Sequence, residues 1–267
     1  MSAGLASPMP DIAAQWAAQV AAHVPASLGT YRDGVAAGTS GAATPLVALR
    51  DPAVFDATLA AFAAGLGVSP GTADRRALVS YWSQFYLAPL ATPVMTALVR
   101  LGRPLPLAFA TTSVELDAAG RPARFLVRPG APEGARAGLA GLVEDHLRPF
   151  VELCRAQCGI APRVIWGNAA VILDYVAREL GEPETLARPE VATCLGWCAE
   201  AARDGAACTL SPLAQALRDR RRRTCCLRQR LPGVASCGEL CPLRESGGCC
   251  GGDAPCGGDA PCEVTDR

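Results

Sequence analysis

The sequence predicts an α+β protein with a mostly helical body, a small antiparallel β-sheet or hairpin, and a C-terminal cysteine-rich segment. Helix-starting signals recur along most of the chain, whereas one central stretch alternates in hydropathy as strands do. Cysteines gather near the C-terminus, where helix and strand signals are few. The 267 residues, half of them hydrophobic, are enough for one main domain with a substantial core and a small appendage.

The first part of the chain predicts three helices and a polar link. The helices cover residues 10–24 (with Asp11 near the start), 51–66 and about 72–99, and the Gly/Ser/Thr-rich link covers residues 29–44. The second helix opens with Asp51 as its cap and Pro52 at its first position. The third helix contains Pro89, which should break or kink it.

That third helix includes a charge-free stretch, residues 77–99, which is long enough to cross a bilayer. The stretch also holds Ser80, Ser83, Gln84 and two prolines. These residues favour a central, kinked helix in the core of a soluble protein. We therefore expect at most peripheral contact with a membrane.

The middle of the chain changes its hydropathic period. Residues 106–116 and 121–128 alternate and are rich in β-formers, and the sequence DAAG at 117–120 makes a turn between them, so we expect a hairpin. Helical patterns then return over residues 133–157, about 167–180, 184–202 and 211–223.

The composition changes again after Arg223. We expect a helical body over residues 1–223, a segment ordered by metal over 224–246, and a disordered Cys/Gly-rich tail over 247–267. The tail repeats CGGDAP and is too poor in apolar residues to fold.

Charge and cysteine usage narrow the function classes. Lys plus Arg and Asp plus Glu both total 25, so no overall field points to nucleic acid or to an anionic membrane. The N-terminus has neither a basic region nor a sustained apolar run, so it does not read as a secretory signal. We therefore expect a cytoplasmic protein whose thirteen cysteines are reduced or bind metal.

Four cysteines make the most informative pattern. They follow the spacing C-C-x10-C-x3-C and are Cys225, Cys226, Cys237 and Cys241. The sequence Leu-Pro-Gly at 231–233 supplies a chain reversal between the pairs, and Gly238 relieves crowding where backbone amides approach sulfur. The spacing favours an iron–sulfur cluster over a four-cysteine zinc site, because zinc-binding pairs are normally about two to four residues apart. Two disulfides are the third alternative and would require an oxidising compartment.

The same segment resembles the C-terminus of the ferric siderophore reductases of the FhuF type. Their hallmark is two adjacent cysteines, ten residues and a Cys-x2-Cys pair, which TCCLRQRLPG followed by CGELCPLR matches in order, in gap and in flanking residues. Two upstream motifs agree, because YWSQFYLAPLATP (81–93) is similar to the family's aromatic helix and Trp166-Gly167-Asn168 to an internal family motif. The resemblance spans about residues 75–244.

The resemblance implies a [2Fe–2S] cluster bound by Cys225, Cys226, Cys237 and Cys241, with no catalytic residue beyond the cluster. It implies one-electron reduction of a ferric siderophore, of the hydroxamate type, with release of Fe(II). The chain has no G-x-G-x-x-G fingerprint and no P-loop, so we expect an external electron carrier such as a ferredoxin, flavodoxin or flavin reductase. The alternative from another class is a non-catalytic interaction protein stabilised by a four-cysteine zinc site.

The sequence departs from the family pattern at its last cysteine. Three residues separate Cys237 from Cys241, where the family usually has two, and Cys249 or Cys250 could replace Cys241. We favour Cys241 because Cys-Pro-Leu-Arg begins there, as it does in the family.

An arginine run borders these cysteines and comprises Arg218, Arg220 to Arg223, Arg228 and Arg230. One interpretation is the solvated end of a helix, where cations are favourable. The other is a docking patch for an acidic electron carrier, or a positive field that raises the potential of the cluster.

The remaining candidates have structural and functional interpretations. Trp166 to Asn168 have two interpretations: a core tryptophan with Asn168 as a helix cap, or a role in packing the cluster or lining the substrate face. Core packing is the commoner role for the aromatic residues Tyr81, Trp82 and Tyr86 and for the helical cysteines Cys154, Cys158, Cys194, Cys198 and Cys208. No sequence motif pairs His23 or His146 with other metal-binding or catalytic residues.

Overall fold

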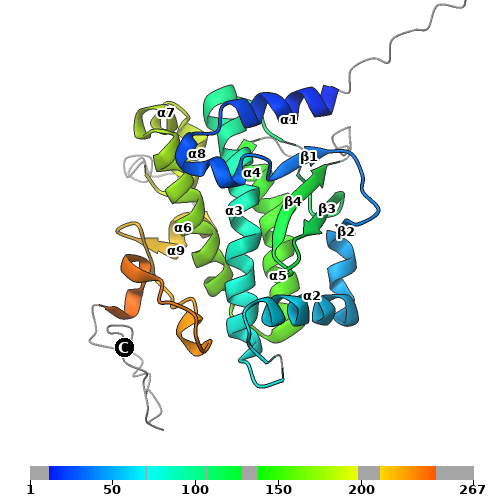
Figure 1. The fold of residues 1–267 in the computed structure, drawn as a ribbon. Coiled ribbons are helices and arrows are strands. Elements are labelled where there is room, and N and C mark those ends of the chain that lie inside the picture. The colour runs from blue at the N-terminus through cyan, green and yellow to red at the C-terminus, as the bar shows by residue number, and fades with distance from the viewer. Residues whose placement is uncertain (1–11, 70, 106, 128–137, 198–210, 245–267) are drawn as a thin grey trace, which may run out of the picture.

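The computed structural model describes residues 12–69, 71–105, 107–127, 138–197 and 211–244. Its centre is a pair of packed helices, α3 (Arg75–Leu101) and α6 (Pro162–Leu180). A small sheet lies against α3, and the C-terminal segment lies against α3 and α6 (Figure 1). The predicted α+β class, a mostly helical body with a small sheet, is confirmed.

Shorter helices surround the central pair. They are α1 (Ile12–Ala22), α2 (Pro52–Gly65), α4 (Gly138–Gly141), α5 (Arg148–Cys158), α7 (Glu182–Leu186), α8 (Pro189–Leu195) and α9 (Pro212–Ala216), with 3-10 turns η1 (Ala26–Tyr31) and η2 (Leu46–Arg50) and a π-helical turn η3 (Leu142–Leu147). The helices predicted at 10–24 and 51–66 are confirmed, and the Asp51 carboxylate accepts the N–H of Ala53 at 2.8 Å as a cap. Asp11 and the predicted tail lie outside the described residues.

Three predicted helices differ from those observed. The helix predicted near 167 begins at Pro162, because proline is well suited to a first helical turn. The helix predicted over 184–202 is divided at Arg188, where Pro189 starts a new helix, and residues 198–210 lie outside the description. The helix predicted over 211–223 ends at Ala216, after which the chain forms a two-stranded hairpin.

Helix α3 runs unbroken through Pro89 and Pro93, so of the break or kink predicted at Pro89 the break is wrong and the kink stays a prediction. Its ends are well defined, because Asp74 accepts the N–H groups of Arg76 and Ala77 and Gly102 closes the helix with a φ of 64°. Residues on most of its surface are buried, as expected for a central helix. Within the described chain, no helix is both long and apolar enough to span a bilayer.

The proline at 93 creates a specific packing site. Since Pro93 has no N–H, the carbonyl of Pro89 lacks the donor that a regular helix would supply. The backbone at Gly34 approaches this carbonyl so closely that a Cβ at residue 34 would lie 2.1 Å from the oxygen. Only glycine therefore permits this contact between α3 and the chain leading into the sheet.

The predicted hairpin is confirmed as β3 (Thr112–Leu116) and β4 (Pro122–Val127). At its turn the Asp117 carboxylate accepts N–H groups from Ala119 and Arg121, at 2.8 and 2.9 Å. The hairpin is the centre of a four-stranded sheet of order β1-β4-β3-β2.

The outer strands of this sheet correct the prediction of a link at 29–44. That region contains part of η1, the strand β1 (Val35–Ala37), and the start of β2 (Thr44–Pro45). β1 pairs in parallel with β4, so the sheet is mixed rather than purely antiparallel. The physical reason is that both edges of a two-stranded hairpin leave backbone N–H and C=O groups to be paired.

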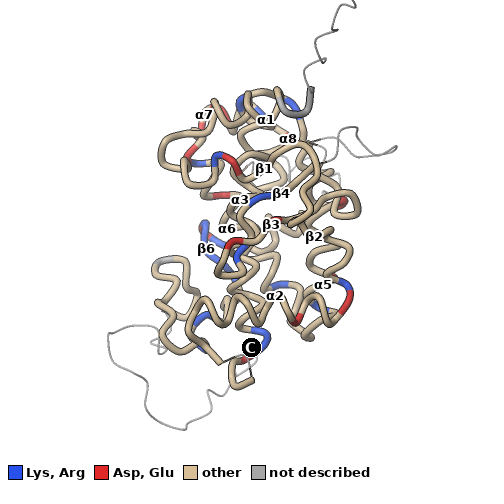
Figure 2. The backbone as a smooth tube through the Cα atoms, turned by 45° about the vertical axis from the view of Figure 1, so that its right-hand side comes forward, with Lys and Arg blue, Asp and Glu red and all other residues tan. Residues whose placement is uncertain are grey.

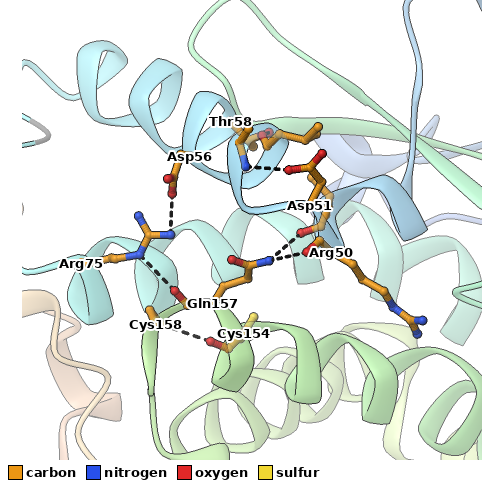
Figure 3. Close-up of polar contacts among 11 residues, drawn as sticks. Arg50, Asp51, Asp56, Thr58, Arg75, Cys154, Gln157 and Cys158 are labelled. Atoms are coloured by element: carbon orange, nitrogen blue, oxygen red, sulfur yellow. Dashed lines mark hydrogen bonds and ion pairs between the residues drawn. The ribbon is translucent and has the colours of Figure 1, made fainter.

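Polar side chains tie α2, α3 and α5 together at one corner of the body (Figure 3). The Gln157 amide donates to the carbonyls of Leu49 and Arg50, at 3.2 and 2.9 Å. Arg75 donates to the Gln157 carbonyl at 3.2 Å and pairs with Asp56 at 2.5 Å. These contacts satisfy backbone groups at the end of α5 and before α2.

The centre of the core is aromatic. Tyr86 stacks on Phe150, with ring centroids 3.9 Å apart, and its hydroxyl lies 2.7 Å from Nε2 of His146. Nδ1 of His146 lies 2.8 Å from the Leu107 carbonyl, so Nδ1 carries the proton and Nε2 accepts from Tyr86. Burial lowers the pKa of His146 to about 4. His146 is therefore a neutral, hydrogen-bonded core residue.

Candidate metal centre

The C-terminal segment brings the four predicted cysteines together. Cys225 and Cys226 follow the hairpin of β5 (Leu217–Arg218) and β6 (Arg221–Arg222), whereas Cys237 and Cys241 flank the 3-10 turn η6 (Gly238–Leu240). The thiol of Cys237 is hydrogen-bonded to that of Cys226, and Cys241 interacts electrostatically with both Cys225 and Cys237. Cys226 and Cys241 are buried, and the other two thiols are partly exposed.

The arrangement is a gathering of thiols and not a closed coordination shell. Within the described ranges, no three side chains among His, Cys, Asp and Glu lie as a group that could hold one metal ion. The seven cysteines that the structure describes are free thiols. Cys249 and Cys250, the predicted substitutes for Cys241, lie outside the described residues.

Backbone N–H groups point toward the first pair of sulfurs. Leu227 adopts a left-handed conformation, with a φ of 61°, and its N–H donates to the sulfur of Cys225 at 3.3 Å. The next N–H, that of Arg228, donates to Cys226. Gly238, which was predicted to relieve crowding, has a φ of 58°, a conformation that glycine adopts without strain.

These contacts set the charge state of the thiols. The hydrogen bond from Cys237 lowers the pKa of Cys226 to about 6, and the positive charge of Arg222 contributes in the same direction. The same hydrogen bond raises the pKa of Cys237, while burial raises that of Cys225. Within this pair, negative charge is therefore favoured on Cys226, to which the Cys237 thiol donates.

Two layers of side chains fix this segment to the body. The Ser80 hydroxyl of α3 donates to the Cys226 carbonyl at 2.7 Å. The Asn168 amide of α6 donates to the Ser80 hydroxyl and carbonyl, each at 3.0 Å, and to the Ser83 hydroxyl at 2.9 Å. A chain of hydrogen bonds thus runs from α6 through α3 to the cysteine pair.

This series of hydrogen bonds decides between the two interpretations of the Trp166-Gly167-Asn168 motif. Asn168 lies inside α6 and is not a cap, so that prediction is wrong. A Cβ at Gly167 would lie 3.9 Å from the Arg222 side chain, which places the arginine stem over this part of α6. The motif therefore packs and anchors the cysteine segment. The sequence reasoning missed the anchoring role of Ser80 and Ser83. The available signal was a pair of serines three residues apart within an otherwise apolar helix.

Arg222 is the most unusual residue of the arginine run. Its side chain is only 4% exposed, and its Nε and Nη1 atoms are buried with no hydrogen-bond partner among the described residues. Its charge acts on the thiols of Cys225, Cys226 and Cys237, while burial lowers its own pKa. A cation in this position favours negative charge on the sulfurs.

The other arginines of the run are dispersed, so the predicted end of a helix is wrong. Arg220 pairs with Glu182 at 2.7 Å and Arg230 with Asp74 at 2.9 Å, whereas Arg218 is exposed. Arg228 lies over the ring of Tyr81, 4.6 Å from its centroid. Figure 2 shows blue segments beside β6, where the chain of this hairpin carries several basic residues. The run folds as a hairpin because residues 219 and 220 both adopt positive φ angles, as two-residue hairpin turns require.

The cysteines of the helical body have a structural role. Cys154 is fully buried in α5, and the Cys158 thiol donates to its carbonyl at 3.2 Å (Figure 3). Cys194 is partly buried in α8, and its carbonyl accepts from the Ser211 hydroxyl. Burial raises the pKa of all three thiols. Cys198 and Cys208 lie outside the described residues.

The predicted aromatic residues divide between core and surface. Trp82 and Tyr86 are fully buried, as predicted for core aromatics. Tyr81 is only partly buried and contacts Arg228, whose Nη2 donates to its hydroxyl at 3.2 Å. Tyr81 therefore lies where the body meets the cysteine segment.

Comparison with known proteins agrees with this arrangement. The family described as "Ferric iron reductase FhuF-like transporter" matches residues 80–225, which is more than half of the chain and ends at the first of the four cysteines. A relative named "Ferric siderophore reductase", from Escherichia coli (strain K12), is 27% identical over 192 residues, covering 64% of this chain and 67% of the relative. The chain therefore belongs to the FhuF family.

Proposed function

We propose that this protein is a cytoplasmic ferric siderophore reductase that uses a [2Fe–2S] cluster bound by Cys225, Cys226, Cys237 and Cys241. Family membership and the name of the relative support the substrate class. The observation that carries the cofactor proposal is the gathering of these thiols beside Arg222, whose buried Nε and Nη1 atoms have no partner in the described part of the chain. An anionic group held by thiolates would satisfy both the charge and the donors of this guanidinium.

The protein's own residues would prepare the site in three ways. The four thiols hold the group, and the N–H groups of Leu227 and Arg228 donate to sulfur and so stabilise negative charge. Arg222 adds a buried positive charge, which raises the reduction potential. When bound, a [2Fe–2S] centre supplies a one-electron donor and acceptor.

Reduction of the substrate follows from the ligand preferences of iron. Siderophores hold iron through hard oxygen donors, which bind Fe(III) far more tightly than Fe(II). One electron passes from the reduced protein to the chelated Fe(III), which leaves Fe(II) and a free siderophore. A separate carrier then returns one electron to the protein. The exposed arginines Arg218 and Arg223 are the docking residues that we propose for an acidic carrier.

Metal and sulfide analysis tests the cofactor directly. We expect anaerobically purified protein to be red-brown, to contain about two irons and two sulfides per chain, as a [2Fe–2S] cluster requires, and to bleach with dithionite. Reduction should produce a paramagnetic signal. A colourless protein that contains zinc and no sulfide would contradict the proposal and support a four-cysteine zinc site.

A single-turnover experiment tests the activity. Dithionite-reduced protein, freed of excess reductant, is mixed with a ferric trihydroxamate and a chelator that traps Fe(II). We expect about one Fe(II) per cluster, with reoxidation of the protein at the same rate, because a [2Fe–2S] centre cycles by one electron. Protein with cluster that stays reduced in the presence of the substrate would contradict the proposed activity.

A docking experiment tests the arginines. The double substitution Arg218→Gln and Arg223→Gln should slow reduction by the carrier and weaken its dependence on salt, because electrostatic steering raises association rates. Arg124→Gln, at an exposed arginine on β4, is the control. An unchanged rate and salt dependence in the double variant would remove these residues from the docking site.

A further inference from the structure

A cavity of about 290 Å³ lies between η1, α3 and α6, beside the cysteine segment. Its wall includes the aromatic residues Tyr31, Tyr81, Phe85 and Tyr175 and the polar residues Gln84 and Arg228. The side chain of Tyr175 is 44% exposed, which is high for an aromatic residue in such a wall. The cavity is therefore open to a ligand from solution.

One residue belongs to both the cavity and the cysteine segment. The guanidinium of Arg228 lines the cavity and lies on Tyr81, whereas its backbone N–H donates to the sulfur of Cys226. Arg228 is two positions after Cys226 in the sequence. Arg228 therefore connects the wall of the cavity directly to the cysteine segment.

The polar atoms of the wall are matched to an oxygen-rich ligand. The Nε2 atom of Gln84 and the Nε atom of Arg228 have no hydrogen-bond partner within the described chain, and both are shielded from solvent, so a ligand reaches them only after the side chains turn. Both are donors, and no carboxylate is among the residues that line the cavity. Such a site favours neutral or anionic ligands with oxygen acceptors and disfavours ligands with a net positive charge.

The aromatic rings supply the remaining contact area. Tyrosine combines a large apolar surface with a hydroxyl group, which suits a ligand that is partly apolar and partly hydrogen-bonding. The cavity volume is at the lower end of the range of about 300–1,000 Å³ that is usual for ligand pockets. A hexadentate iron chelate exceeds this volume, so part of it would project past Tyr175.

We infer that this cavity binds the substrate, and that it selects neutral or anionic Fe(III) chelates with oxygen ligands over chelates of the same type that carry a cationic group. The inference rests on the proposed function and adds the location of the substrate and the basis of its selection. Arg228 supplies the positive charge of the wall and Gln84, once its side chain turns, donates to an oxygen atom of the chelate, while Tyr81 and Tyr175 pack against its apolar surface. Electrons then have a short path from the cysteine segment to the chelated iron.

Binding can be measured apart from reduction by using gallium. A Ga(III) trihydroxamate has the charge and shape of the ferric complex and does not undergo this reduction, so calorimetric titration reports binding alone. We expect the purified full-length protein to bind a neutral Ga(III) trihydroxamate about tenfold more tightly than an analogue with a pendant ammonium group, which is a modest charge effect.

Two substitutions test the location. Ala88→Leu adds volume at the cavity wall and should weaken binding by about tenfold or more. Arg228→Gln removes the charge, and should both weaken binding by about tenfold and narrow the preference for the neutral chelate. The matched controls are Ala57→Leu and Arg163→Gln, at exposed positions of α2 and α6, which should leave the affinity unchanged.

The binding measurements can overturn either the location of the site or the inference as a whole. Wild-type affinity in both Ala88→Leu and Arg228→Gln would overturn the location, and absence of binding by the wild-type protein would overturn the inference altogether. Iron and sulfide content and single-turnover reduction of the Fe(III) complex are measured on the same preparations. If reduction proceeds while the cavity variants bind normally, the inference fails and the proposed function stands.

Discussion

The aromatic core and the cysteine segment of this protein differ in how their buried polar groups are hydrogen-bonded. Around Tyr86 the polar groups are matched within the chain, because its hydroxyl donates to His146 and His146 donates to the Leu107 carbonyl. In the cysteine segment, buried donor atoms of Arg222 and Arg228 have no partner in the part of the chain that the structure describes. The comparison indicates that the core is completed by its own side chains, whereas the cysteine segment is suited to a bound anionic group.

The two regions also differ in what stabilises them. The core buries large aromatic side chains from several helices and from the sheet, which contributes most of the folding free energy. The described part of the cysteine segment has short 3-10 turns, and Leu231 is its principal contribution to the hydrophobic core. Substitutions in one region should therefore leave the other largely intact.

The largest expected effect comes from removing a thiol. Cys226→Ser should abolish iron and sulfide binding while the helical body stays folded, because the core does not depend on the segment. Elemental analysis and visible absorption measure the first effect, and far-UV circular dichroism with thermal unfolding measures the second. Cys158→Ser, at a thiol of α5, is the matched control and should retain iron and sulfide. Full iron and sulfide content in the Cys226 variant would exclude this residue as a ligand.

The reverse test perturbs the core. Gly34→Ala places a Cβ against the Pro89 carbonyl, and should lower the free energy of unfolding by about 3 kcal/mol through overpacking against backbone that cannot move aside. Chemical denaturation measures the change. Gly29→Ala is the control, because a Cβ there meets nothing within 4 Å. The folded fraction of the Gly34 variant should keep its normal ratio of iron to protein, and loss of iron from folded protein would contradict the independence of the two regions.

Acid should destabilise the core through His146. Its pKa is about 4 in the folded protein, against about 6.5 when unfolded, so the unfolded chain takes up a proton first as the pH falls. The contribution of this group is complete above pH of about 6.5 and is lost progressively toward a pH of about 4, where the loss reaches about 3 kcal/mol. Unfolding measured across this range should follow that slope. His146→Gln should flatten it, and an equal slope in both proteins would assign the acid sensitivity to other groups.

Sequence reasoning succeeded where local signals act alone. The cap at Asp51 and the turn at Asp117 were readable because each side chain bonds to backbone within a few residues. The four cysteines were selected by their spacing, and the structure brings them together. Local chemistry therefore predicted the main elements, whereas the role of the four cysteines as ligands stays a prediction.

Sequence reasoning failed where distant segments decide. β1 and β2 are too short to show a period, and they form because the edges of the β3–β4 hairpin need partners. Asn168 resembled a cap but lies inside α6, where its partners Ser80 and Ser83 come from another helix. The arginine run looked uniform, although long-range contacts, among them one with α6 at Gly167, bury Arg222. No pattern along the chain encodes these long-range contacts.

The smallest expected effect is electrostatic and concerns Arg222. Removing its charge leaves the thiols in place and makes it harder to add an electron to the centre that we propose they hold, so Arg222→Gln should lower the reduction potential. For a separation of about 6 Å and an effective dielectric constant of about 20, the loss is on the order of 100 mV. Redox titration followed by the paramagnetic signal measures this shift. Arg220→Gln, at an exposed arginine paired with Glu182, is the control and should change the potential by only about 20 mV, because solvent screens an exposed charge. Equal shifts in the two variants would show that the potential responds to the net charge of the hairpin, and that burial of Arg222 beside the thiols has no special effect.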